Sequence, residues 1–299
     1  MNLPISRRNL LIGIPYTWLM LFFLIPFVIV MSISLSDPVI AIPPYSPVLS
    51  TNDGLAGVWN YLTQLDFENF AIVLEDDVYL SSYLNSVQMA LTTTLLCLLL
   101  GYPIAYAIAS SPMHWKTRFI MAINLTFWCS FLIRIYAWIV LLGNQGVVNN
   151  ILLSLGVIDS PIQMLNTDFA VYLGLVYAYL PLMIFPVYAT LEKLDNSVYE
   201  ASRDLGCSHI ESFFRVTLPL SRPGMLAGAF LVFVPVTGEY IVPSLLGNAS
   251  TPVIGRVLWN EFFSNGDWPL AASISVLLML VLVLPIVLYQ FFSNRNEEK

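Results

Sequence analysis

The segment Val198–Ser221, VYEASRDLGCSHIESFFRVTLPLS, is a polar stretch between two long apolar runs. Two Ser-x-x-Glu capping boxes, Ser197–Glu200 and Ser208–Glu211, predict the starts of two short helices, because such a pair satisfies the first free amides of a helix. Gly206 falls between them, where a helix end needs a residue that tolerates left-handed dihedrals. Pro219 and Pro223 are expected to stop the second helix before the fifth apolar run. The segment is therefore expected to form a compact pair of helices, which could lie on lipid headgroups or dock a soluble partner.

The rest of the chain has the composition of a membrane protein. Of its 299 residues, 58% are hydrophobic and 10% are charged, and the mean hydropathy is +0.76. A soluble domain carries about a quarter charged residues. We predict an all-α integral membrane protein with a single domain over 1–299 and the polar stretch as a loop over 195–222, because apolar runs of this length span lipid as helices. Six runs have that length: about 10–35, 85–109, 119–142, 169–191, 224–246 and 269–292.

The distribution of Lys and Arg predicts the orientation of these spans. Most of the twelve basic residues fall on one side of the predicted membrane: Arg7, Arg8, Lys116, Arg118, Lys193, Arg203, Arg215, Arg222, Arg295 and Lys299. Arg256 lies alone on the other side, and Arg134 lies within the third run. The positive-inside rule then places both termini and the loop over 195–222 in the cytoplasm.

The predicted outer loops are acidic and contain two amphipathic stretches. Their acidic residues are Asp37, Asp53, Asp66, Glu68, Glu75, Asp76, Asp77, Asp159, Asp168, Glu261 and Asp267. This excess fits the positive-inside rule and ordinary solubility, or a field that concentrates cations at an entrance. Helical spacing predicts a short helix at Phe67, Phe70 and Leu74, and another at Val147, Ile151 and Leu155.

Two charges fall inside predicted spans, and each needs a partner or a polar cavity. Glu239 lies in the fifth run and Arg134 in the third. They could pair with each other; alternatively, Glu239 lines a path for a cationic solute, and Arg134 is neutralised by another chain. Aromatic faces could assist a cation, although most aromatic residues in spans pack or anchor. The candidates are Tyr136, Trp138, Tyr177, Tyr179 and Tyr240.

Motifs for catalysis, nucleotide binding and metal binding do not occur in the sequence. A phosphate-binding loop needs Gly-Lys followed by Ser or Thr, but none of the three lysines follows a glycine. The two histidines, His114 and His209, are isolated, and no metal-ligand spacing surrounds them. We therefore predict a chain that is not an enzyme, holds no cofactor or metal, and does not bind nucleic acid. In the fifth run, Gly224 and Gly228 have the small-xxx-small spacing that permits close helix contact.

The polar stretch also matches a long motif with fixed spacing, EAA-x3-G-x9-I-x-LP. It resembles the cytoplasmic signature of permease subunits in bacterial ABC importers, with Ser202 in place of the second Ala and Val216 in place of Ile. In that family the segment is the coupling helix, which sits in a groove of the ATP-hydrolysing subunit. The resemblance implies that the ATPase contact involves Glu200, Ala201, Ser202, Gly206, Val216 and Pro219.

Further segments resemble the permeases of spermidine/putrescine importers, and are most similar to the putrescine-type permeases. They are SFLIRIYAW (Ser130–Trp138), YAYLPLMIFPVY (Tyr177–Tyr188), LEKLD (Leu191–Asp195), LVFVPVTGEYIVPSLLG (Leu231–Gly247) and IGRVLWNEFF (Ile254–Phe263). The resemblance implies a type I ABC importer permease in the bacterial inner membrane that imports polyamines. It also implies a heterodimer with a second homologous permease, two copies of an ATPase that binds ATP and Mg, and an extracytoplasmic polyamine-binding protein.

Three other functions stay open at this point. A related permease for another small organic cation or amine would keep the same cytoplasmic motif. A self-sufficient secondary carrier would need an inverted repeat and several intramembrane charges, which the sequence does not clearly show. A membrane scaffold could dock a soluble partner through the same loop.

Overall fold

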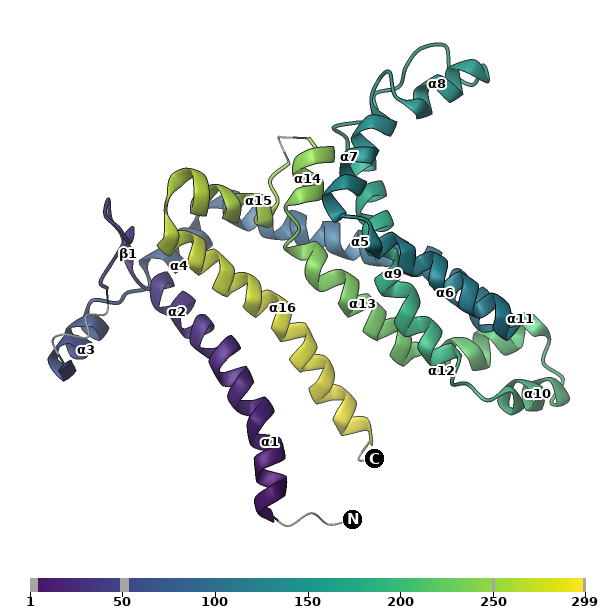
Figure 1. The fold of residues 1–299 in the computed structure, drawn as a ribbon, viewed down its shortest axis with the longest axis horizontal. Coiled ribbons are helices and arrows are strands. Elements are labelled where there is room, and N and C mark those ends of the chain that lie inside the picture. The colour runs from purple at the N-terminus through teal and green to yellow at the C-terminus, as the bar shows by residue number, and fades with distance from the viewer. Residues whose placement is uncertain (1–4, 49–53, 249–250, 298–299) are drawn as a thin grey trace. The chain divides into compact units, whose positions relative to one another are not determined.

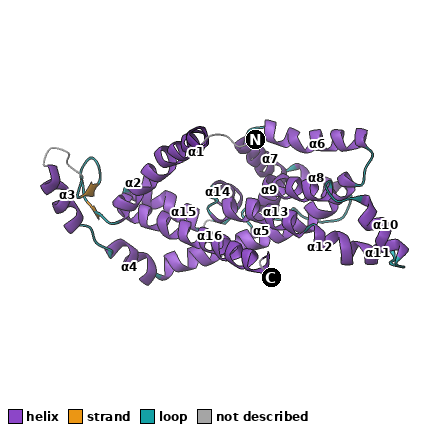
Figure 2. Cartoon of the chain, turned by 90° about the horizontal axis from the view of Figure 1, so that it is seen from below, coloured by secondary structure: helices purple, strands orange, loops and turns teal. Residues whose placement is uncertain are grey.

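The computed structural model describes residues 5–48, 54–248 and 251–297. Figure 2 shows that helices make up most of this length, as the composition predicts. Asp53 and Lys299, which entered the charge analysis above, lie outside the described residues.

The chain divides into two compact units. Unit 1 combines Met1–Ser81 with Val257–Lys299, and unit 2 is Ser82–Arg256. The organisation of 1–299 as one permease domain stays a prediction.

Unit 1 holds both ends of the chain. Its elements are α1 (Ile5–Leu19), the π-helical η1 (Met20–Leu24), α2 (Ile25–Ser34), β1 (Asp37–Pro38), β2 (Tyr45–Ser46), α3 (Gly54–Thr63), α4 (Glu68–Glu75), η4 (Asn260–Asn265) and α16 (Trp268–Glu297). The long helix α16 packs against α2 and α4. The two strands pair antiparallel, with Asp37 opposite Ser46. In Figure 1, α1 begins and α16 ends at the same end of this unit.

Unit 2 is built around one central helix, α9, which contacts α7, α13 and α14. Leu175, Met183 and Val187 of α9 are fully buried in its core. The elements of this part of the chain are α5 (Asp77–Ala109), α6 (Met113–Trp128), α7 (Phe131–Leu142), α8 (Val147–Ser154), α9 (Asp168–Leu191), α10 (Asn196–Asp204), α11 (His209–Ser212), the π-helical η3 (Phe213–Thr217), α12 (Leu218–Leu220), α13 (Arg222–Thr237), α14 (Ile241–Leu246) and α15 (Ile254–Trp259). Helices α5 and α15 cross the boundary between the units.

Several helical segments are long and apolar enough to cross a membrane. There are 4 continuous candidates in the described residues: Leu11–Ser34, Asp77–Ala109, Phe131–Ser154 and Asp168–Leu191. A fifth candidate is a pair of helical stretches, His209–Leu220 and Arg222–Thr237, bent by 61°. The apolar part of α16, Trp268–Leu284, is shorter. The all-α membrane fold is confirmed, whereas the count of six spans stays a prediction.

One predicted span is broken in the structure. The run over 119–142 is not one helix, because Cys129 and Ser130 leave the helical conformation, with ψ of 140° and 135°. Ser130 is the N-cap of α7, a position that serine favours over a helix interior. The predicted span over 85–109 lies within α5, which begins earlier, at Asp77. Oδ1 of Asp76, just before α5, accepts a hydrogen bond from the Val78 amide.

The two amphipathic helices predicted in the outer loops are confirmed. Helix α4 contains Phe70 and Leu74, and α8 contains Val147 and Ile151. Gly156 follows α8 with φ of 67°, a left-handed conformation that glycine adopts without strain.

The predicted small-residue pair, Gly224 and Gly228, lies at the contact between α9 and α13. A Cβ atom on Gly224 would lie 2.7 Å from the backbone oxygen of Pro186 and 2.5 Å from Oγ1 of Thr190. A Cβ atom on Gly228 would lie 2.7 Å from the sulfur of Met183. The backbones of α9 and α13 therefore approach closely, which is possible because glycine has no side chain at these two positions.

We predict that Gly224→Ala destabilises the protein by about 1–3 kcal/mol, because the added methyl group overlaps backbone that cannot move alone. The measurement is the midpoint of thermal unfolding in detergent micelles. Gly13→Ala in α1 is the matched control, since a Cβ atom there meets nothing within 4 Å. An unchanged midpoint for Gly224→Ala would contradict the close contact.

Candidate functional site

The polar loop forms two helices, as predicted, but the first helix begins differently. The side chain of Asp195, not Ser197, caps α10, and its Oδ1 accepts a hydrogen bond from the Ser197 amide at 2.9 Å. The predicted Ser197–Glu200 capping box is therefore wrong, because the chain leaves its extended conformation at Asp195 and α10 already includes Asn196. This hydrogen bond holds the pKa of the Asp195 carboxyl below its ordinary value. The charged form caps α10 at neutral pH, and its contribution is lost as the pH falls through that lowered pKa.

The end of α10 follows the prediction. Gly206 has φ of 90°, and its amide donates to the Arg203 carbonyl oxygen at 2.8 Å. The Cys207 amide donates to the Ser202 carbonyl oxygen at 3.1 Å, which completes a Schellman motif. A glycine is needed here because other residues are strained at this dihedral.

The second helix begins and ends where the sequence predicts. Oγ of Ser208 accepts a hydrogen bond from the Glu211 amide at 3.2 Å, so this cap is confirmed. The helical path passes Pro219 and ends at Leu220, before Pro223. The path continues from α11 through η3 into α12, and it bends by 61° only before α13. A π-helical turn precedes the proline, as η1 precedes Pro26, which fits the backbone hydrogen bond that proline cannot donate.

Contacts with α5 fix the loop to the bundle. The ring of Phe213 packs edge-on against Tyr102 and Tyr106 of α5, at centroid distances of 5.7 and 5.4 Å. Oγ of Ser221 lies 2.9 Å from the hydroxyl of Tyr102. Within the loop, the Ser202 hydroxyl donates to Oγ of Ser212 at 2.8 Å and joins α10 to α11. Figure 1 shows α10, α11 and α12 at the C-terminal end of α9.

The motif residues divide between the anchored side and the free side. Ser202 is buried, and Val216 and Pro219 are half-buried, whereas Glu200, Ala201 and Gly206 are exposed. Large apolar side chains accompany the exposed set: Leu205 (87% exposed), Ile210 (73%) and Phe214 (60%). Exposed apolar side chains of this kind are typical of a surface that a partner protein or lipid headgroups cover.

The fifth predicted span is broken at its acidic residue. Helix α13 ends at Thr237, α14 begins at Ile241, and Glu239 lies between them with 9% of its surface exposed. Its Oε1 accepts hydrogen bonds from the amides of Ile241 at 2.9 Å and Val242 at 3.4 Å. The Tyr179 hydroxyl, from α9, donates to its other oxygen. The carboxylate thus replaces the backbone partners that the break removes.

The structure does not pair the two intramembrane charges. No ion pair joins Arg134 to Glu239 in the part of the chain that the structure describes. Nε and Nη1 of Arg134 are buried without a hydrogen-bond partner. The guanidinium carbon lies 5.6 Å from the ring centre of Phe131 and 5.9 Å from that of Tyr177. Aromatic faces attract such a cation, but they do not replace its missing acceptors.

The predicted aromatic residues separate into three places. Tyr179 is bonded to Glu239, whereas Trp138 contacts Tyr177 edge-on at 5.5 Å, beside Arg134. Tyr136 is 55% exposed on α7. Tyr240 is half-buried next to Glu239 in the chain. The sequence reasoning missed Tyr102 and Asp195, although a capping Asp before a helix was a visible signal.

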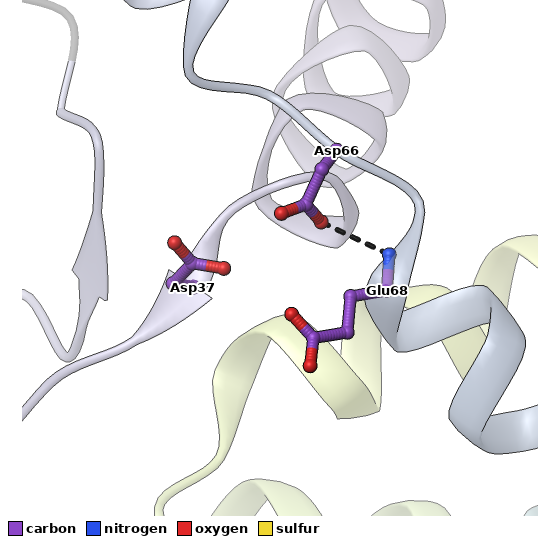
Figure 3. Close-up of side chains that lie close together, drawn as sticks. All are labelled: Asp37, Asp66 and Glu68. Carbon is purple, nitrogen blue, oxygen red and sulfur yellow. Dashed lines mark hydrogen bonds between the residues drawn. The ribbon is translucent and has the colours of Figure 1, made fainter.

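Three carboxylates gather on the predicted outer face of unit 1 (Figure 3). Oxygens of Asp37, Asp66 and Glu68 lie within 4.8 Å of one another. Oδ1 of Asp66 accepts a hydrogen bond from the Glu68 amide at 2.9 Å, so one of the three has a structural task at the start of α4. Sequence spacing could not place Asp37 here, because β1 brings it from about thirty residues away. The group concentrates negative charge on this surface.

Comparisons with known proteins agree on a family. Residues 77–297 match the family model described as binding-protein-dependent transport system inner membrane component. The chain is 36% identical, over 94% of its length, to the spermidine/putrescine transport system permease protein PotB of Haemophilus influenzae, of which it covers 92%. It is 40% identical, over 78% of its length, to the protein of the same name from Escherichia coli, of which it covers 84%.

The fold agrees as well. A chain from the bacterial alginate ABC transporter, solved in complex with an alginate pentasaccharide-bound periplasmic protein, superposes with a TM-score of 0.69 at 14% identity. The likeness covers 97% of this chain and 96% of that one, and at this identity it shows the fold alone. The family consists of membrane subunits of transporters, so the chain is a permease subunit of the inner membrane and not an enzyme. On the matched residues and the two relatives together, the chain belongs to the family of binding-protein-dependent transport system inner membrane components.

Proposed function

We propose that this chain is the translocation subunit of an ATP-driven importer that moves putrescine, spermidine or both from the periplasm into the cytoplasm. The observation that carries this substrate is the likeness, over most of the chain, to two permeases named for spermidine and putrescine. A buried carboxylate in a broken span and an acidic set of outer loops suit a cationic cargo.

The proposed topology has six spans, both termini in the cytoplasm and the type I architecture of ABC importers. The distribution of basic residues supports it, as does the position of the start of α1 and the end of α16 at one end of unit 1. In this topology the loop over 195–222 faces the cytoplasm, and the carboxylates of Figure 3 face the periplasm.

The loop is the proposed contact with the ATPase, of which two copies would serve the complex and bind ATP and Mg. The support is its division into an anchored side and a free side that exposes Glu200, Ala201 and Gly206 together with Leu205. Ser202, Val216 and Pro219 would hold that surface in place from behind. A loop fixed in this way transmits a push to the helices on either side of it.

A second, different permease is the proposed neighbour in the membrane. Arg134 has two buried nitrogens without acceptors, which is costly unless an assembled partner supplies a carboxylate. A second copy of this chain is a poor source, because Glu239, its intramembrane carboxylate, is already bonded to Tyr179 and to α14. A heterodimer answers this constraint better than a homodimer.

Glu239 is the proposed centre of the substrate path. Opening of the site would expose its carboxylate to an ammonium group, with Tyr179 and Tyr240 nearest to it. Tyr136, Trp138 and Tyr177 would offer aromatic faces further along α7 and α9. A periplasmic polyamine-binding protein would deliver the cargo. Membership of a binding-protein-dependent family leaves a self-sufficient carrier or a scaffold without support.

We predict that proteoliposomes containing this chain, a second permease and the ATPase take up labelled putrescine or spermidine only with ATP and the binding protein present. Competition by 4-aminobutanoate tests the alternative of another small amine. In this molecule a carboxylate replaces one terminal aminomethyl group of putrescine. Uptake without ATP would contradict the proposal, and efficient competition by the zwitterion would change the substrate class.

We predict that Gly206→Ala lowers the amine transported per ATP hydrolysed by about threefold or more, because a side chain is strained at φ of 90° and displaces the loop. Gly156→Ala is the matched control, since that glycine also has positive φ and open space but lies outside the loop. If both variants transported the same amount of amine per ATP hydrolysed, the proposed contact of the loop with the ATPase would be contradicted.

We predict that Glu239→Gln lowers uptake by about tenfold or more while assembly persists, because Gln keeps the backbone acceptor but loses the charge that meets an amine. Initial rates of labelled uptake provide the measurement, and co-purification with the ATPase reports assembly. Glu75→Gln, at an exposed residue of α4, is the matched charge change. Normal uptake by Glu239→Gln would remove this residue from the path.

A further inference from the structure

A cavity of about 150 Å³ lies within unit 2, on the side that is predicted to face outward. It is walled by the first half of α5, the start of α9, the end of α14 and the stretch that leads into α15. Its volume admits several water molecules, and so an ammonium group with the methylene groups that follow it. The side chains that matter for its chemistry are Asn85, Gln88, Met89, Asp168, Val171 and Tyr172.

The lining carries one negative charge and no positive charge. Asp168 is the only charged residue among the described residues that line the cavity. Its carboxylate forms no hydrogen bond or ion pair with another described residue, since Thr167 performs the capping of α9 and accepts the Ala170 amide. All of its acceptor positions are therefore available to a ligand, and the side-chain oxygen of Gln88 offers a further acceptor.

The other walls suit methylene groups beside a cation. The ring of Tyr172 offers an aromatic face, and Met89, Val171 and Val253 are apolar. A short alkylammonium ion uses both kinds of wall. A metal cation such as Ca²⁺ needs more oxygen ligands than one carboxylate and two amides supply comfortably, and it gains nothing from apolar side chains. An anion would be repelled by Asp168.

Hydrogen bonds hold the walls of the cavity together in the absence of a ligand. The side-chain amide of Asn85 donates to the carbonyl oxygen of Pro252 at 3.1 Å and joins α5 to the stretch before α15. The Asn166 amide donates to the carbonyl oxygen of Leu246 at 3.0 Å and joins the chain before α9 to the end of α14. A ligand would therefore bind without the cost of ordering these elements.

Two of the walls lead from the cavity to Glu239. Helix α14 has 6 residues, with Glu239 just before its start and the cavity residues Pro243 and Gly247 at its end. At about 1.5 Å per residue, α14 separates the two places by about 9 Å. The stretch before α15 also reaches the break, since a Cβ atom on Gly255 would lie 2.5 Å from the backbone oxygen of Gly238.

We propose that this cavity is an outer binding site for one ammonium group of the imported amine, occupied before the amine reaches Glu239. The site rests on the proposed function, because the proposed cargo is the class of ligand that the lining suits. Asp168 is exposed, whereas Glu239 is buried and bonded to Tyr179, so an arriving amine meets Asp168 first. An amine held there is concentrated beside the break in the span.

The test measures the reactivity of a cysteine placed in the cavity by Gln88→Cys, because Gln88 lines the cavity and is exposed. Cys129 and Cys207 are replaced by serine, and Cys97 is buried. The complex with the second permease and the ATPase, without nucleotide or binding protein, is labelled with uncharged methyl methanethiosulfonate at constant ionic strength. Mass spectrometry gives the initial labelling rate. We predict that putrescine lowers this rate severalfold and that 1,4-butanediol, an uncharged molecule of the same length, does not.

The decisive variant is Asp168→Asn in the same background, which removes the charge and keeps the shape of the side chain. We expect about twofold to fivefold more putrescine to be needed to halve the labelling rate, as suits the loss of one exposed ion pair. Asp159→Asn makes the same charge change at an exposed residue before α9, outside the cavity, and should leave the protection unchanged. Equal protection in Asp168→Asn and its parent, or no protection by putrescine, would overturn the site.

The order of the two sites is tested by Glu239→Gln in the Gln88→Cys background. Putrescine should still protect the cysteine, because the outer site fills first, and loss of protection would overturn that order. Protection that depends on Asp168 in a complex that imports no putrescine supports the site, in which case only the proposed function fails. Import of putrescine by a complex whose labelling rate putrescine does not change overturns the site and leaves the proposed function standing.

Discussion

An apolar span leaves no water to satisfy a broken backbone, so each interruption of a helix must be closed by the chain itself. This constraint explains why Glu239 is tolerated where α13 gives way to α14. The carboxylate accepts the amides that begin α14, and the Tyr179 hydroxyl holds it from α9. The carboxylate is thus the structural acceptor that stabilises the break.

The polar loop over 195–222 has a different kind of stability from the apolar bundle. Its polar groups are satisfied by local caps at Asp195, Ser208 and Gly206, so its shape does not depend on contact with a partner. Phe213 and Ser221 fix it to α5, and its outer surface keeps exposed apolar side chains. A preformed surface of this kind binds without the ordering cost of a flexible loop.

The sequence predicted the elements better than their boundaries. Composition and periodicity were sufficient for an all-helical membrane chain and for the two outer helices α4 and α8, because these depend on local patterns. The break at Cys129 and Ser130 was missed, since apolar length alone does not report where a capping residue interrupts a helix. The first cap was assigned to Ser197 because the motif Ser-x-x-Glu was weighed and the preceding Asp195 was not.

The candidate site was predictable as far as its motif. The fixed spacing of the motif identified its residues in the loop over 195–222, but only the fold shows which of them are exposed and which are buried. The partner of Glu239 was not predicted from the sequence, which offered Arg134 or a cationic solute. The packing of α9 places the Tyr179 hydroxyl there, and Arg134 lies beside Phe131 and Tyr177 instead.

The close approach of α9 and α13 has a mechanical consequence. Gly224 stands one turn or less from the loop that joins these helices, and its contact with Pro186 and Thr190 leaves no slack between them. The two helices are therefore packed as one rigid pair. Any displacement of the loop over 195–222 would move both helices together, and the break in the chain between Thr237 and Ile241 lies at the other end of α13.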